Sequence, residues 1–174
     1  YAVFLTVEGI DGAGKTSLVA GLAGALGATA LREPGGVHVA ERIRELVKGE
    51  DCDPRAEALL FAAARAQLVA EALRPRLERG ETILLDRFVD SSLAYQGAGR
   101  GLGVEAVAAV NAFAIAGLVP DRTLYLRLDA ATSLARVGHR GDADRFEDLA
   151  FLERVAETYD ALAAADPERW VCLL

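Results

Sequence analysis

The sequence has no methionine, one tryptophan and two cysteines among 174 residues. Cys52 and Cys172 are far apart and in no metal-ligand spacing, so we expect free thiols rather than a disulfide framework or a zinc site. No apolar run approaches the ~20 residues that a membrane-spanning helix needs. The apolar stretch at the N-terminus also lacks the preceding basic segment of a secretory signal. These absences predict a cytoplasmic protein with no membrane partner.

Positive charge is scarce as well. The 19 Lys and Arg residues are outnumbered by 26 Asp and Glu, which gives a net charge of −7 and a pI near 4.9. Such a chain repels polyanions, so general nucleic-acid binding is not expected, and an anionic substrate must be held by a local cluster of arginines and backbone N–H groups. With 52% hydrophobic residues, residues 1–174 are enough for one well-buried domain and too few for two.

Three apolar segments, AVFLTV, TILLD and RTLYLRL, lack the polar alternation of half-exposed strands, which favours a parallel sheet covered on both faces. Residues 29–32 and the segment RWVCLL are weaker strand candidates. Between the strands, apolar periodicity predicts helices over 15–26, 37–47, 54–79, 104–116, 130–136 and 148–165. Alternating strands and helices indicate an α/β fold, with ligand sites at the carboxyl ends of the strands.

Local signals refine this pattern. Asp53 before Pro54 is a good helix start, since the carboxylate can accept free N–H groups and proline is tolerated in the first turn. Pro75 is expected to kink the same helix near its end. The glycine-rich segments GAGRGLG, residues 97–103, and GHRGDAD, residues 138–144, are expected to be flexible loops. The second carries arginines between two predicted helices, which predicts a lid over about 138–147.

The segment EGIDGAGKTS contains the pattern of glycine, four residues, glycine, lysine and threonine, between a predicted strand and a predicted helix. Glycines allow the backbone N–H groups to face phosphate oxygens, and the helix adds its positive end. Lys15 is expected to bridge the β- and γ-phosphates, and Thr16 to ligate magnesium. The predicted ATP-binding loop comprises Gly9, Ile10, Asp11, Gly12, Ala13, Gly14, Lys15, Thr16 and Ser17. The pattern alone does not separate kinases, GTPases and ATPases.

The rest of the chain favours a kinase. It lacks the asparagine-lysine-x-aspartate segment with which GTPases read guanine, whereas a kinase acting on a small phosphorylated acceptor needs a second anion site. Asp86 and Arg87 end the TILLD strand, where the carboxylate can hold magnesium through water and the guanidinium can grip phosphate; an ordinary strand-end ion pair is the alternative. The segment REPGG, residues 32–36, either allows close backbone approach to a ligand or is a plain turn.

Two further groups have both a functional and an ordinary interpretation. Phe61 and Arg65 are four residues apart on one helix face, where they either stack on and hydrogen-bond a base or are a core phenylalanine and a solvated arginine. Arg136, Arg140 and Arg145 bracket the predicted lid. They are either solvated helix-end charges or the cations that a closing lid brings to the transferring phosphate.

Together, the segments EGIDGAGKTS, REPGG, LLFAAARAQ, DRFVDSSLAYQG, PDRTLYL and DRFE resemble the thymidylate kinase family in content, order and spacing, over nearly the whole chain. The resemblance implies a P-loop nucleoside monophosphate kinase fold with a five-stranded parallel sheet flanked by helices. It also implies a homodimer and the transfer of the γ-phosphate of ATP to dTMP, giving dTDP and ADP for dTTP synthesis, with Mg²⁺ as cofactor.

The same resemblance implies residue roles. On the acceptor side, dTMP is expected to contact Asp11, Glu33, Pro34, Arg44, Phe61, Arg65, Arg87, Ser92, Tyr95 and Gln96. For the base, Phe61 would stack on thymine, while its polar edge would be read by Arg65, Ser92 and Gln96. For the sugar, Tyr95 would lie beneath the ring and Asp11 would meet the 3′-hydroxyl. The phosphate would be positioned by Arg87 with Arg44 and Glu33. On the donor side, Arg136 would lie against adenine, and Arg140 with Arg145 would bring lid charge. The expected catalytic set is Lys15, Asp11, Asp86, Arg87 and Arg140, with Thr16 and Asp86 as metal ligands.

Three departures from the family pattern stand out. One branch of the family carries arginine at the position of Gly12, so this chain should depend on its lid arginines instead. Phe88 replaces a frequent tyrosine, which removes a hydroxyl. The sequence ends at ADPERWVCLL, where family members continue through an adenine-side loop and a final helix. The alternatives are a kinase for a broader set of deoxynucleoside monophosphates, or a nucleotide-binding module without turnover.

Overall fold

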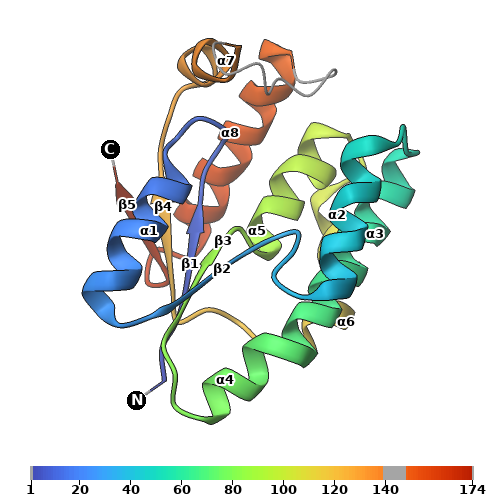
Figure 1. Ribbon diagram of the computed structural model, residues 1–174. Coiled ribbons are helices and arrows are strands. Elements are labelled where there is room, and N and C mark those ends of the chain that lie inside the picture. The colour runs from blue at the N-terminus through green and yellow to red at the C-terminus, as the bar shows by residue number, and fades with distance from the viewer. Residues whose placement is uncertain (1, 139–147, 174) are drawn as a thin grey trace.

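The computed structural model describes residues 2–138 and 148–173. Its centre is a sheet of five parallel strands in the order β2-β3-β1-β4-β5 (Figure 1). This confirms the expected five-stranded parallel sheet, including the two weaker strand candidates. The strands are β1 (Phe4–Glu8), β2 (Thr29–Arg32), β3 (Ile83–Asp86), β4 (Arg122–Leu126) and β5 (Trp170–Leu173).

Helices cover both faces of the sheet (Figure 1). They are α1 (Lys15–Leu26), α2 (His38–Gly49), α3 (Pro54–Leu68), α4 (Arg74–Glu78), α5 (Val89–Ser92), α6 (Val104–Ile115), α7 (Ala130–Gly138) and α8 (Leu149–Ala165), with π-helical segments η1 (Val69–Leu73) and η2 (Leu93–Gly99). The predicted helices are confirmed, with differences of one or two residues at most of their ends. In the part of the chain that the structure describes, no helix is long and apolar enough to cross a membrane.

The internal strand β3, between β2 and β1, explains why the TILLD segment lacks polar alternation. Ile83, Leu84 and Leu85 are all fully buried. Leu84 packs with Val19 on the α1 face, whereas Ile83 and Leu85 pack with Leu68 on the face covered by α3 and η1. A strand with helices on both faces has no position that favours a polar side chain.

The long predicted helix over 54–79 is three consecutive segments. It begins as expected, because the Asp53 carboxylate accepts a hydrogen bond from the Arg55 N–H at 2.9 Å. Near its end, η1 adopts π-helical hydrogen bonding directly before α4, which contains Pro75. Proline lacks the N–H that an α-helical turn requires, so the departure from regular α-helix falls where the sequence placed the kink.

The expectation of a flexible loop over 97–103 was wrong in its first half. Residues 97–99 belong to η2, and Gly97 and Gly99 are buried. A Cβ atom at Gly99 would lie 2.6 Å from Cε2 of Phe151, a core residue of α8. The glycine therefore serves close packing between η2 and α8 rather than flexibility.

Replacing Gly99 by alanine should consequently lower the free energy of unfolding by about 1–3 kcal/mol, because the added methyl group overlaps a buried ring. Chemical denaturation measures this change. The matched control is Gly24→Ala in α1, where a Cβ atom meets nothing within 4 Å; it should raise stability by up to about 1 kcal/mol. Equal stability of the Gly99→Ala variant and the unmodified chain would contradict the packing role.

Candidate active site

The glycine-rich loop runs from the end of β1 into α1, as predicted. Gly9 has φ 142°, and a Cβ atom there would lie 2.5 Å from the backbone oxygen of Leu126, so only glycine fits. Gly14 precedes α1 with φ 96°, no side chain caps this helix, and its first turn holds no acidic residue. The N–H groups at the start of α1 are thus available to an anion, and the helix dipole adds to the attraction.

Lys15 is the first residue of α1, directly after this loop, and is 7% exposed. Its Nζ donates a hydrogen bond to the backbone oxygen of Ile10 at 2.9 Å. Burial, followed by the nearby charge of Arg87, lowers the pKa of Lys15 to about 8. An anionic phosphate would favour the charged ammonium and thereby raise this pKa.

Thr16, in the first turn of α1, meets Asp86, the last residue of β3. The Thr16 hydroxyl donates to Asp86 Oδ2 at 3.0 Å, and both residues line a cavity of about 400 Å³. Among the described residues, no group of three or more His, Cys, Asp or Glu could hold a metal ion. One hydroxyl and one carboxylate fit Mg²⁺, which is commonly bound through one or two protein oxygens together with substrate phosphates and waters.

Arg87 connects the end of β3 to the glycine-rich loop. Its Nη2 donates to Asp11 Oδ1 at 2.6 Å, and its guanidinium lies over the ring of Tyr95, 4.9 Å from the centroid. The Tyr95 hydroxyl in turn donates to Asp11 Oδ2 at 3.0 Å. Burial would raise the pKa of Asp11, but the charges of Arg87 and Lys15 outweigh it and hold that pKa below its ordinary value. Three predicted site residues are therefore in direct contact.

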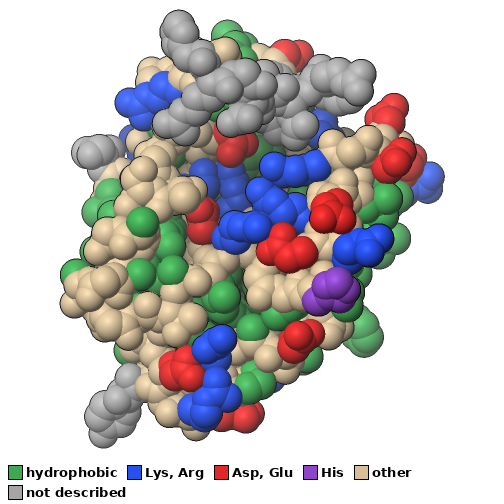
Figure 2. All heavy atoms as spheres, in the orientation of Figure 1, with side chains coloured by type: hydrophobic (Ala, Val, Ile, Leu, Met, Phe, Trp, Pro, Cys, Tyr) green, Lys and Arg blue, Asp and Glu red, His purple; other side chains and the backbone are tan. Residues whose placement is uncertain are grey.

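Figure 2 shows this face of the molecule, where basic side chains gather near the middle with acidic side chains among them. Although the chain has a net charge of −7, this face therefore carries the local basic cluster that an anionic substrate requires.

Arg65 is a buried hub rather than a solvated helix residue. It is 2% exposed. Its Nε and Nη2 donate to Glu33 Oε2, at 2.8 and 2.5 Å. Nη2 also donates to the backbone oxygen of Phe88. Nη1 donates to Ser92 Oγ at 3.0 Å and to Asn111 Oδ1. All five guanidinium N–H groups thus have protein acceptors. The structure brings Glu33 to Arg65, a contact that the sequence did not predict, because a buried carboxylate needs a cationic partner. The expected role of Glu33 at the acceptor phosphate stays a prediction.

The remaining acceptor-side residues lie around this hub. Phe61, one turn before Arg65, is half-buried. The Gln96 amide donates to Glu57 Oε1 at 2.9 Å, and Arg100 Nε donates to the same oxygen at 3.3 Å. Glu57 thereby orients the Gln96 amide, although no motif in the sequence includes Glu57.

The REPGG segment is more than a plain turn. Arg44 Nη1 from α2 donates to the backbone oxygen of Pro34 at 3.0 Å. Glu41 accepts both the Arg32 guanidinium, at 3.0 Å, and the Gly36 N–H, at 2.8 Å. These bonds hold the segment against α2, with Arg44 at its edge.

Arg136 is the only predicted lid arginine within the described residues. Its Nη1 donates to the backbone oxygen of Gly12 at 3.0 Å, and a Cβ atom on Gly12 would lie 3.2 Å from its Cβ. α7 is thereby joined to the glycine-rich loop, and a side chain at position 12 would press on Arg136. Arg140, Arg145 and the predicted lid, apart from Gly138 at the end of α7, lie outside the described residues.

Sequence reasoning missed Glu8, Asn111 and Tyr159. Glu8 is fully buried at the end of β1, and burial, followed by the charge of Asp90, raises its pKa to about 7. A carboxylate in an apolar strand and a single asparagine in the Ala-rich helix α6 were both available as signals. Tyr159 carried no such signal, because it follows the apolar face of α8.

Phe88 is a core residue. It is 1% exposed, and its ring packs edge-on against Phe4 with centroids 5.3 Å apart. The hydroxyl that tyrosine would add at this position would thus enter apolar packing.

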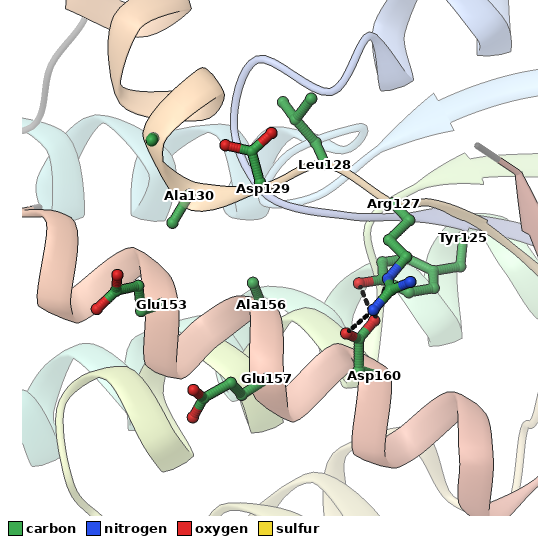
Figure 3. A pocket seen from close by; sticks show the side chains of 10 residues that line it. Tyr125, Arg127, Leu128, Asp129, Ala130, Glu153, Ala156, Glu157 and Asp160 are labelled. Atoms are coloured by element: carbon green, nitrogen blue, oxygen red, sulfur yellow. Dashed lines mark hydrogen bonds and ion pairs between the residues drawn. The ribbon is translucent and has the colours of Figure 1, made fainter.

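A cavity of about 520 Å³ lies apart from this site, between α7, α8 and the end of β4 (Figure 3). Its lining includes Arg127, which pairs with Asp160 at 2.7 Å, together with Asp129, Glu153 and Glu157. The surplus of carboxylates makes it unsuited to phosphate. None of the predicted nucleotide-binding residues lines it.

The comparisons with known proteins agree with this geometry. The model of a family described as thymidylate kinase matches residues 7–174. The chain belongs to the thymidylate kinase family. It is 48% identical to a thymidylate kinase of Deinococcus radiodurans over 98% of this chain and 87% of that protein, and 45% identical to one of Lactobacillus delbrueckii subsp. bulgaricus over 95% and 84%. The crystal structure of thymidylate kinase from Ehrlichia chaffeensis is similar with a TM-score of 0.84 and 29% identity, over 99% of this chain and 92% of that one.

Proposed function

We propose that ATP binds at the glycine-rich loop of this thymidylate kinase family member, and that dTMP binds at the residues around Arg87 and Arg65. The reaction is transfer of the γ-phosphate of ATP to dTMP, giving dTDP and ADP. The observation that carries the assignment is the contact between the two sites. Arg87, at the end of β3, donates to Asp11 within the loop at 2.6 Å.

On the donor side, the N–H groups at the start of α1 and the Lys15 ammonium hold the β- and γ-phosphates. Arg136 lies beside the loop through its bond to Gly12, in a position to contact the nucleotide. Arg140 and Arg145, which lie outside the described residues, would add positive charge at the phosphates. Little covalent chemistry is needed, because in-line positioning and neutralisation of charge account for phosphoryl transfer.

On the acceptor side, Arg87, helped by Arg44, holds the phosphate of dTMP. Phe61 stacks on thymine, and Ser92 and Gln96 face its polar edge. Tyr95 and Asp11 contact the sugar. Because Arg65 already donates to protein acceptors, its first role is to hold Glu33, Ser92 and the Phe88 backbone in place, and it contacts the base by exchanging one of these bonds.

Mg²⁺ is the proposed cofactor, and Thr16 and Asp86 would hold it together with phosphate oxygens. When bound, it neutralises charge on the transferring phosphate. The direct bond from the Thr16 hydroxyl to Asp86 at 3.0 Å keeps the two protein oxygens together.

The test is ADP release with ATP and Mg²⁺, measured separately for dTMP, dUMP, UMP, AMP and CMP as acceptors. Turnover with dTMP well above the others is expected. Comparable turnover with several deoxynucleotides would favour the broader kinase, and nucleotide binding without turnover would favour a binding module.

We also propose a homodimer formed through α2, α3 and α6. At one side of the sheet, α3 packs against both α2 and α6 (Figure 1). The three helices carry exposed apolar side chains, notably Leu46, Leu59 and Phe113, the last 90% exposed. Water-exposed apolar side chains on adjacent helices favour burial against a second copy.

Replacing Phe113 by aspartate should therefore shift the protein from dimer to monomer, because a charge at the centre of an apolar contact loses its hydration. Sedimentation velocity measures the change. Val119→Asp is the control, since Val119 is also exposed but follows α6 in a loop. A monomeric unmodified chain, or identical sedimentation of the Phe113→Asp variant and the dimeric parent, would refute the interface.

A further inference from the structure

Glu8 is the charged residue buried deepest beside the active site. It ends β1 and is fully buried. Its Oε1 accepts the Phe88 N–H at 2.7 Å, while its Oε2 accepts the Ser91 hydroxyl at 2.5 Å and the Tyr159 hydroxyl at 3.0 Å. Burying a carboxylate is costly unless hydrogen bonds replace its hydration. Here three donors from two separate parts of the chain converge on it.

Each of these donors is linked to Arg87. The Ser91 hydroxyl accepts a hydrogen bond from Arg87 Nη1 at 3.0 Å, and the Tyr159 hydroxyl lies 3.4 Å from the same nitrogen. The third donor, the Phe88 N–H, follows Arg87 directly in the chain. Glu8 is thus connected to the Arg87 guanidinium through one intervening hydroxyl, that of Ser91 or that of Tyr159. It also bonds the backbone of the residue that follows Arg87.

The backbone at Arg87 needs such support. Its φ is 69°, in the left-handed region that side chains other than glycine, asparagine and aspartate rarely adopt. Strained conformations of this kind persist only where the surroundings hold them, and they cluster at functional sites. The Glu8 bond to the next N–H and the β-type bond from Arg87 N to Val7 O, at 3.0 Å, hold this turn.

We infer that Glu8 is a positioning residue, which fixes the Arg87 guanidinium through Ser91 and Tyr159 so that it points at the acceptor phosphate. The inference rests on the proposed function, in which Arg87 binds the phosphate of dTMP. The opposite side of the guanidinium is held by Asp11. Glu8 does not touch the substrate, and it acts only by orienting the residue that does.

Glu8→Gln keeps the shape of the side chain but replaces one accepting oxygen by an N–H₂ group. Isothermal titration calorimetry should then give an affinity for dTMP reduced about tenfold, which corresponds to the loss of one charge-assisted hydrogen bond. The affinity for thymidine, which has no phosphate, should stay unchanged, and so should the KM for ATP. A structural defect alone would weaken dTMP and thymidine equally.

Two further variants decide the outcome. Tyr159→Phe removes the hydroxyl that contacts both Glu8 and Arg87 while keeping the ring. It should lower the affinity for dTMP about threefold and leave the affinity for thymidine unchanged. This variant also tests the inference if Glu8→Gln does not fold. Thr6→Val is the control, because Thr6 lies on the same strand and its buried hydroxyl bonds that of Thr123, at 2.9 Å. This variant should leave the ratio of dTMP to thymidine affinity unchanged. An unchanged ratio in Glu8→Gln and Tyr159→Phe overturns the inference. Failure of the unmodified protein to bind dTMP would instead overturn the proposed function.

Discussion

Replacing Lys15 by alanine is expected to lower the turnover number by about 10²–10³-fold, the usual cost of removing one group that stabilises transition-state charge. The affinity for dTMP should change little, because Lys15 belongs to the donor loop. Coupled ADP release and dTMP titration measure the two quantities. Lys48, the one other lysine in the chain, is exposed on α2, and Lys48→Ala is the control that should leave turnover unchanged.

The pH dependence adds a second measurement on the same residue. Because burial and Arg87 lower the pKa of Lys15 to about 8, the ammonium of the free enzyme is charged below this pH and neutral above it. The value of kcat/KM for ATP should therefore fall as pH rises through about 8. Bound phosphates raise the pKa, so kcat at saturating ATP should stay level to higher pH. A fall in both parameters at the same pH would contradict this role.

Arg65→Met is expected to have the largest effect on stability, a loss of about 3–5 kcal/mol, because it removes one partner of a buried ion pair and leaves Glu33 unpaired. Urea denaturation measures the loss. Arg55→Met, an exposed arginine on the same helix, should have little effect. The double variant Arg65→Met with Glu33→Gln should recover part of the stability, since no buried charge remains.

The loss at position 65 should also depend on pH. Burial raises the pKa of Glu33 even beside Arg65, and without that cation the folded-state pKa should rise further above its unfolded value. A carboxyl group of this kind binds its proton more tightly in the folded state, so its stabilising contribution is present at low pH and is lost as pH rises through the folded pKa. The deficit of Arg65→Met should therefore be larger at pH 8 than at pH 5. A deficit that does not change with pH would show that Glu33 is not the cause.

The sequence predicted the elements of the sheet well because their signals are local. The apolar strands, the glycine-rich loop and the Asp53 helix start each follow from a few consecutive residues. The packing of η2 could not be predicted in this way, since Gly99 has meaning only beside Phe151, which lies far along the chain. A glycine in a loop and a glycine under an aromatic ring look alike in one sequence.

The site residues also separate into those with a local sequence signal and those brought together only by the fold. Lys15 and Thr16 were selected from the glycine-lysine-threonine pattern, and Asp86 and Arg87 from their place at the end of a strand, where a parallel sheet places its ligands. The groups that hold Arg87 were not found, since Glu8 and Tyr159 are brought together only by the fold. The ion pair between Glu33 and Arg65 was not predicted for a related reason: the sequence gives no sign that Arg65 is turned inward rather than towards solvent.

The uncapped start of α1 links the stability of the folded chain to the concentration of nucleotide in the cell. The first turn has no side chain to satisfy its N–H groups, so a triphosphate that binds there also completes the helix. Ligand that binds only the folded state adds to its stability with the logarithm of its concentration. Bound nucleotide would thus contribute to the stability of the folded enzyme, and the enzyme would be least stable in a cell depleted of ATP.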